Sequence, residues 1–297
     1  MRGNLRPQLV EKDYWLMHCL YGLNQCGIEF DMKGGTSLSK GYGIIERFSE
    51  DIDLKVAPTP GLPTKTGQTR DTHTAKRKAF FDQLQSQIVI PGIEAVEVDP
   101  DFADDAMRHV GLRLIYPTVF ESLPSLKRGI LLEIGFDDTE PNEPRTISSW
   151  AFDQAKTSGF QPGKDILDNR AINIRCYHPG FTFVEKLQAV STKYRLERSG
   201  QGMPQNFLRH YYDIYALLAV PEVQAFIGTE RYHQRKQERF RTQDNLDIRT
   251  NEAFFIPDPA VLQAYEQEYA RISSIFYGAP PSLQQILARI AENIDRL

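Results

Sequence analysis

The sequence predicts an α+β protein with a mixed β-sheet core and flanking helices, followed by a mostly helical second half. Extended apolar segments, such as residues 109–116 and 129–136, fall in the first part of the chain. From Phe181 onward, apolar residues recur at helical spacing instead. We therefore expect two domains, residues 1–176 and 177–297. A chain of 297 residues with 41% hydrophobic residues is long enough to bury two cores.

The first domain is expected to begin with an amphipathic helix, because Val10, Tyr14, Met17 and Tyr21 recur at helical spacing and Gly27 follows as a stop signal. The remaining expectations follow from apolar alternation, proline and glycine punctuation, and helical periodicity. They are strands over 28–32, 51–56, 109–116 and 129–136, a helix starting within 36–42, a loop over 57–72, a helix over 74–89, and an acidic, proline-rich turn region over 137–146. Residues 147–176 are ambiguous and include a candidate strand at 171–176.

The second domain is expected to be a set of helices. Residues 181–198 carry one apolar stripe, and residues 199–205 interrupt it. Further helices are expected over 206–220, 260–276 and 282–296. No internal repeat is visible.

The composition narrows the classes of function. A net charge of −4 argues against a protein that coats nucleic acid without specificity, although it leaves room for a local basic groove. Residues 1–15 lack the apolar core of a signal peptide, and no apolar run is long enough to cross a bilayer. We expect a cytoplasmic protein that does not associate with membranes.

Two carboxylates alternate along the predicted strand 51–56. Residues i and i+2 of a strand point to the same face, so Asp51 and Asp53 should project side by side while Ile52 and Leu54 are buried. Two carboxylates about 4 Å apart repel by about 1 kcal/mol in water and by about 4 at an effective dielectric near 20. This arrangement calls for a divalent cation, and hard oxygen ligands favour Mg²⁺ or Mn²⁺.

Glu133 is a lone acid inside the apolar segment 129–136. Burying such a group is costly unless it is paired or bound to a metal. Beside the two aspartates it would complete a carboxylate triad that holds two cations. The alternative is a salt bridge to an arginine such as Arg113.

A small-residue turn lies just before the two aspartates in the sequence. Gly34 and Gly35 would let backbone N–H groups approach a phosphate closely, and Ser37 would add a hydroxyl. A helix that begins here would direct its positive end at the same anion. With Thr36 and Lys40 we assign this segment to nucleotide binding. The pattern is not a Walker A loop, and an ordinary strand-to-helix turn is the alternative.

Three features of the second half carry candidate chemistry. Lys186, on the first helix of that half, is a candidate site residue, and the alternative is an ordinary solvated lysine. Asp213 is a second candidate. It lies four residues after Arg209, so the alternative is an exposed helical ion pair between these two residues. A basic stretch with aromatic residues includes Arg231, Arg235 and Lys236, which we assign to contacts with an RNA backbone, a solvated helix face being the alternative.

Taken together, these segments resemble the AbiEii/AbiGii toxin family of nucleotidyltransferases, the enzymatic half of type IV toxin–antitoxin and abortive-infection systems. The resemblance covers most of the chain. It is carried by Val10–Trp15, KGGTSLSK, RFSEDIDL, Tyr116–Thr118, the strand with Glu133, FVEKLQAV and RHYYDIYALL. GGTSL followed by SEDIDL is the most specific part of it.

The resemblance implies a nucleotidyltransferase fold of the DNA polymerase β type. It places Gly35 and Ser37 on the nucleotide phosphates and Asp51 and Asp53 on the metal. It also implies that Lys186 contacts the triphosphate, and that Asp213 is catalytic or holds the acceptor and the lysine in place.

The function that follows is a metal-dependent toxin that uses Mg²⁺ or Mn²⁺. It would transfer a nucleoside monophosphate from an NTP to an RNA acceptor, the 3′ end of tRNA, and so block translation and serve in phage defence. A co-expressed antitoxin would restrain it without a stable complex. The alternatives are a nucleotidyltransferase acting on a small molecule or a protein, and a non-catalytic nucleotide-binding module.

Overall fold

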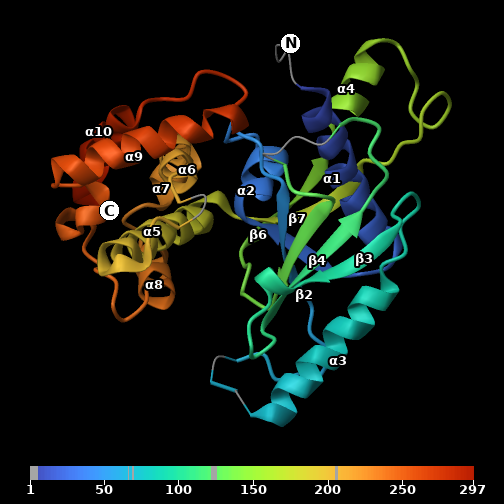
Figure 1. Ribbon diagram of the computed structural model, residues 1–297, viewed down its shortest axis with the longest axis horizontal. Coiled ribbons are helices and arrows are strands. Elements are labelled where there is room, and N and C mark those ends of the chain that lie inside the picture. The colour runs from blue at the N-terminus through green and yellow to red at the C-terminus, as the bar shows by residue number, and fades with distance from the viewer. Residues whose placement is uncertain (1–5, 66, 69, 122–125, 205–206) are drawn as a thin grey trace. The chain divides into compact units, whose positions relative to one another are not determined.

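The computed structural model describes residues 6–65, 67–68, 70–121, 126–204 and 207–297 (Figure 1). They divide into two compact units. The first contains the residues up to Tyr42 and Ser49–Tyr177, and the second contains Gly43–Phe48 and His178–Leu297. Parts of the predicted loop 57–72, the predicted break 199–205 and the predicted helix 206–220 fall on residues 66, 69 and 205–206, which lie outside the described residues.

The first unit is built on a mixed sheet of seven strands in the order β3-β4-β5-β2-β1-β7-β6. The central strand β2 runs antiparallel to β1 and parallel to β5. This confirms the predicted α+β class. The strands are β1 (Phe30–Lys33), β2 (Asp51–Val56), β3 (Ala95–Asp99), β4 (His109–Ile115), β5 (Ile130–Gly135), β6 (Asn142–Ile147) and β7 (Ala171–Tyr177).

One face of this sheet carries the hydrophobic core. Alternate residues of β2 and β5, among them Ile52 and Leu132, pack against apolar residues of two helices. These helices are α1 (Pro7–Gln25) and α3 (Asp71–Gln87), both of which were expected from helical periodicity. Because side chains alternate along a strand, the intervening residues of β2 and β5 project from the opposite face.

Two edge strands were not predicted from the sequence. β6 lies in the segment expected to be an acidic turn, and β3 lies in a segment to which no element was assigned. Both strands are at the edges of the sheet. β6 lacks apolar alternation, whereas β3 is short and offers only Val96 and Val98 in alternation with acidic residues. Pro144 is tolerated in β6 because an edge strand can dispense with one backbone donor. The short helix α4 (Trp150–Thr157), capped by Ser149, occupies part of the ambiguous region.

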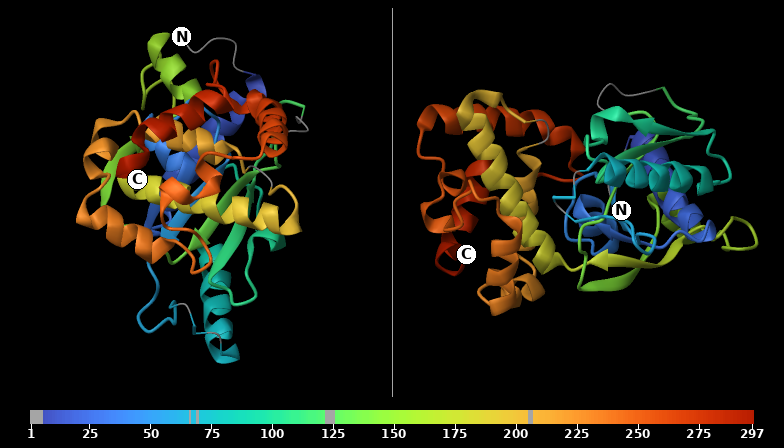
Figure 2. Two further views of the ribbon diagram at one scale, coloured as in Figure 1. Left: turned by 90° about the vertical axis from the view of Figure 1, so that its left-hand side faces the viewer. Right: turned by 90° about the horizontal axis from the view of Figure 1, so that it is seen from below.

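The second unit is helical, as predicted. Helix α5 packs against α6, α7 and α8, and Figure 2 shows it in yellow among the orange and red helices of this unit. The segment Gly43–Phe48 joins the unit through hydrogen bonds between Phe48 and Ile275 and between Tyr277 and Glu46. The helices are α5 (Pro179–Leu196), α6 (Arg209–Leu217), α7 (Pro221–Phe226), α8 (Glu230–Arg239), α9 (Pro259–Arg271) and α10 (Leu283–Asn293).

Among the helices of the described residues, none combines the length and the apolar character needed to span a bilayer.

Candidate functional site

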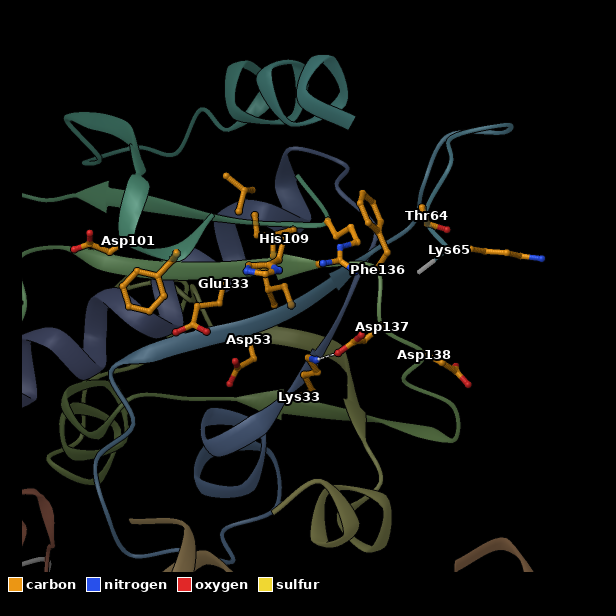
Figure 3. Close-up of a pocket in the computed structure, with 16 residues that line it drawn as sticks. Lys33, Asp53, Thr64, Lys65, Asp101, His109, Glu133, Phe136, Asp137 and Asp138 are labelled. Atoms are coloured by element: carbon orange, nitrogen blue, oxygen red, sulfur yellow. Dashed lines mark hydrogen bonds and ion pairs between the residues drawn. The ribbon is translucent and has the colours of Figure 1, made fainter. Parts of the chain in front are cut away.

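Asp53 and Glu133 are direct neighbours across the sheet. They are register partners in the parallel pair β2–β5, so both side chains project from the same face, opposite the core (Figure 3). Ile52 and Leu54 are buried on the core face, as the alternation predicted. The guanidinium of Arg113, the alternative partner considered for Glu133, donates from Nε to Asp99 Oδ2 at 3.1 Å.

Asp51 is the most enclosed acid of the group, with 6% of its surface exposed. Its Oδ2 lies 3.4 Å from Nζ of Lys127. Its Oδ1 is buried and accepts no hydrogen bond within the described part of the chain. The ammonium of Lys127 also lies 4.8 Å from the centroid of the Phe102 ring. Asp51 therefore keeps an unused acceptor at the point where the sequence predicted a cation ligand.

Gly34 is the glycine of the turn that touches the acids. It follows β1, whose last residue Lys33 is the register partner of Asp53. Its φ of +69° is one that side chains rarely adopt, and a Cβ on Gly34 would overlap Oδ2 of Asp53. Gly34 is thus required both by the backbone conformation and by the close approach of the carboxylate.

The helix expected to begin within 36–42 begins earlier, at Gly34, and is mostly π-helical. It forms one turn of α-helix, α2 (Gly34–Thr36), followed by a π-helical turn, Ser37–Gly41. Thr36 and Ser37 are fully buried. The Thr36 hydroxyl donates to the carbonyl of Asp51, while Ser37 faces the thiol of Cys176. The hydroxyl of Thr36 thus fastens the turn to β2, and the hydroxyl of Ser37, predicted to bind a phosphate, is buried inside the fold.

Lys40 is held on the other side of the turn. Its Nζ lies 2.6 Å from Oδ1 of Asp13 on α1, and Asp13 Oδ2 also accepts the backbone N–H of Trp150 at 2.7 Å. Lys40 is not among the residues that line the pocket beside Asp53. The structure therefore shows Lys40 in an ion pair that joins the turn to α1.

A cavity of about 750 Å³ opens beside Asp53 and Glu133. Figure 3 shows their side chains with Lys33 and Asp137, which form an ion pair of 2.6 Å. The pocket belongs wholly to the first unit. Its wall combines cationic, acidic and aromatic side chains, which favours a polar ligand with an apolar face. The pocket is also lined by Asp101, Phe102, Arg108, His109 and Phe136.

The donor set suits Mg²⁺ or Mn²⁺, since carboxylate oxygens are hard ligands. The unused Oδ1 of Asp51 fits such an ion. Within the described residues, no group of three or more His, Cys, Asp or Glu side chains is already placed to hold a metal. The three predicted ligands are therefore on one face without forming a ready-made cage.

In the second unit, Asp213 is fully buried between two cations. Arg47 donates to both of its oxygens at 2.7 Å, and Nζ of Lys186 lies 3.0 Å from Oδ2. Burial alone would raise the pKa of Asp213, but the charges of Arg47 and Lys186 outweigh burial and hold that pKa below its usual range. The exposed helical ion pair considered for Asp213 is excluded by this burial.

The basic stretch forms α8, and two of its cations are not on the surface. Arg235 and Lys236 are each 6% exposed. Arg235 pairs with Glu185 at 3.1 Å, and Lys236 donates to the carbonyl of Leu297. Their aliphatic stems are buried with them, so they do not form the predicted RNA surface. Arg231 alone of the three is exposed, beside the ring of Phe181.

Three residues of these sites were missed in the sequence. Arg47 precedes the SEDID motif and carries no local signal of its partner, which is 166 residues away. Lys127 and Phe102 lie in segments without periodicity, so no local pattern indicates the contact of Lys127 with Asp51 or that of Phe102 with Lys127. Of the three, only Arg47 lies in a segment that carries the family resemblance, where it is the first residue of RFSEDIDL.

Comparison with known proteins agrees with the resemblance read from the motifs. Residues 18–289 match the family model described as nucleotidyl transferase AbiEii toxin, type IV TA system. No curated protein sequence matches the chain. Among solved structures, an antigenic nucleotidyltransferase-like protein from Paracoccidioides brasiliensis matches with 12% identity and a TM-score of 0.34, covering 79% of this chain and 91% of that one. The chain belongs to the AbiEii family of nucleotidyltransferase toxins of type IV toxin–antitoxin systems.

Proposed function

We propose that this nucleotidyltransferase transfers a nucleoside monophosphate from an NTP to a hydroxyl at the 3′ end of an RNA, with tRNA as the acceptor. The observation that carries this proposal is the pairing of Asp53 with Glu133 beside the pocket, with the backbone of Gly34 against Asp53. Acids next to a glycine turn suit a reaction in which charge on phosphate oxygens must be stabilised.

Asp51, Asp53 and Glu133 would hold the divalent cations, with Oδ1 of Asp51 as an available ligand atom. When bound, Mg²⁺ or Mn²⁺ lowers the pKa of the attacking hydroxyl and neutralises charge on the triphosphate. Binding would require small side-chain movements, because the described carboxylates do not form a closed metal cage.

The chain's own groups have separable roles in the proposal. Backbone N–H groups of Gly34 and Gly35 bind phosphate oxygens, since a glycine backbone allows close approach. Lys186 contacts the triphosphate. Asp213 keeps its ammonium in place, and Arg47 fixes Asp213. Asp213 is a positioning residue here, because both of its oxygens are taken by cations. Of the basic stretch, Arg231 is the residue that remains for an RNA contact.

The test is mass spectrometry of total tRNA after incubation with the protein, Mg²⁺ and each NTP in turn. A mass increase of one nucleotide at the 3′ end is expected with wild type and with D105N, which changes an exposed carboxylate of the same unit. D53N should lose about a hundredfold to a thousandfold in rate, as removal of an electrostatic catalytic group does. Labelling of an aminoglycoside or of protein, with tRNA unchanged, would contradict the RNA acceptor.

The biological part of the proposal is growth arrest relieved by an antitoxin that does not form a stable complex with this chain. Expression of wild type should stop growth, and D51A should not. Equal toxicity of the two would indicate that nucleotide binding alone causes arrest, as in the non-catalytic alternative.

A further inference from the structure

We infer that the pocket of the first unit binds the unpaired 3′-terminal nucleotide of the RNA acceptor, with Phe102 as the surface on which its base stacks and Arg108 as a phosphate contact. This inference rests on the proposed function and assigns the acceptor to one part of the site.

The order of the strands places the glycine turn and most of the pocket wall on opposite sides of β2, the strand that carries Asp51 and Asp53. The turn at Gly34 follows β1, which lies on one side of β2, whereas β5 and β4 lie on the other side. In phosphoryl transfer, the attacking and leaving oxygens are roughly in line on opposite sides of the phosphorus. A triphosphate whose leaving group rests on the turn is therefore attacked from the side of β5 and β4. Most of the pocket's wall comes from these strands and their flanking residues.

An aromatic ring is built into that side. Gly111 on β4 is the register partner of Glu133. A Cβ on Gly111 would lie only 2.6 Å from the Cβ of Phe102, so the absence of a side chain there lets the 3₁₀ turn Pro100–Phe102 sit against the strand. Phe102 is partly exposed, lines the pocket, and stands one strand away from Glu133. An unpaired base can use such a ring because every base has a π face.

Arg108 supplies a cation at the same wall. Its Nε donates to Oδ2 of Asp104 at 2.8 Å, and its side chain is 40% exposed. No acceptor within the described ranges takes up its two terminal nitrogens, so they remain for a phosphate oxygen. Asp104 fixes the guanidinium without enclosing it. A ring for the base and a guanidinium for the phosphate are the two contacts that single-stranded RNA requires.

The pocket's acidic residues make a duplex a poor occupant. Asp101, Asp137 and Asp138 share the wall with the cations, and the ion pair between Lys33 and Asp137 closes part of it. A duplex presents two phosphate backbones and hides its bases. The concave, mixed-charge wall therefore suits a single terminal nucleotide.

The test measures RNA binding without NTP. The probes are a synthetic hairpin RNA with a short unpaired 3′ tail and the same hairpin with a blunt end. Wild type should bind the tailed RNA more tightly. F102L should weaken that binding about fivefold to a hundredfold, which is the usual effect of losing a stacked base, and F102Y should retain it. F160L, which changes an exposed phenylalanine elsewhere in the unit, is the matched control and should have no effect.

R108Q provides a second variant, which removes a half-exposed guanidinium and its ion pair with Asp104. It should lower the slope of log affinity against log salt by about 0.7, the value for one lost phosphate contact on a single strand. Equal binding of tailed and blunt RNA by wild type, or unchanged binding by both F102L and R108Q, would overturn the inference. So would a loss of NTP affinity in F102L without a loss of RNA affinity, which would place the base of the donor in the pocket.

The binding assay and the transfer assay fail in different ways. Tail-specific binding that depends on Phe102, together with no labelling of any RNA, would contradict the proposed function and leave the pocket assignment intact. Labelling of tRNA by wild type, together with tail binding that ignores Phe102, would contradict the pocket assignment alone.

Discussion

Arg47 and Asp213 form a buried bidentate ion pair, with both N–O distances at 2.7 Å. Lys186 adds a second cation at 3.0 Å from Oδ2. Two positive charges therefore share one negative charge, and the cluster keeps a net charge of +1. In the proposed function, Asp213 would therefore orient Lys186 without cancelling the charge that the triphosphate would meet.

Replacing Arg47 by Gln should destabilise the protein by about 3–5 kcal/mol, because one partner of a buried ion pair is removed and the other loses its compensation. The measurement is urea denaturation followed by circular dichroism. R271Q removes an arginine from an exposed pair with Glu268 and should cost less than about 1 kcal/mol. Similar small losses in both variants would show that the Arg47 pair contributes little.

Replacing Gly34 by Ala should abolish transfer while leaving a folded protein, because the new Cβ would collide with the Asp53 carboxylate. G27A is the matched control. Gly27 has nearly the same φ, +70°, but a Cβ added there would meet no atom of the described residues within 4 Å. Both variants should lose about 1–2 kcal/mol of stability from the positive φ. Only G34A should lose about a hundredfold or more in kcat, since it alone displaces Asp53, a proposed metal ligand. Equal activity in the two variants would contradict the role of the close approach.

Mn²⁺ should raise the melting temperature of wild type, and D51N should lose that shift, since the unused Oδ1 of Asp51 is the proposed ligand atom. K127Q should bind Mn²⁺ about three to ten times more tightly, because the Lys127 ammonium 3.4 Å from Oδ2 repels the cation. Calorimetric titration in the absence of NTP gives both affinities. Weaker binding by K127Q would mean that the lysine supports the site.

Stability should rise with pH between about 8 and 10.5 through Lys236. Burial lowers the pKa of this lysine from 10.5 to about 8 in the folded chain. Across that window the unfolded chain binds more protons than the folded chain, so deprotonation favours folding. The stability of wild type relative to K236M should therefore increase by about 1–3 kcal/mol from pH 7.5 to 9.5 in urea denaturation. A constant difference would place the pKa of Lys236 near its ordinary value.

Local patterns predicted much of the framework. The alternation in β2 and the apolar run of β5 identified both strands, because one face of each is buried in the core. Edge strands β3 and β6 were not predicted. In β3 only Val96 and Val98 alternate with acidic residues, which is too short a pattern to decide, and β6 has no apolar alternation and contains Pro144. The register that places Asp53 beside Glu133 depends on pairing between distant segments, which no local pattern encodes.

Buried cations were the harder feature to anticipate. Arg235 and Lys236 look like surface residues by type, yet their stems pack within the second unit and their charged groups find internal acceptors. Arg47 is likewise indistinguishable by type from a solvated arginine. Only the folded chain shows which of these charges meet a partner.

The second unit is discontinuous in the sequence, because it includes Gly43–Phe48 as well as His178–Leu297. A fragment that begins at residue 178 would lack Arg47 and leave Asp213 with one of its two cations. A chimera that exchanges the helical unit between two members of the family must therefore exchange two segments rather than one. The segment 43–48 has to come from the same parent as the helices.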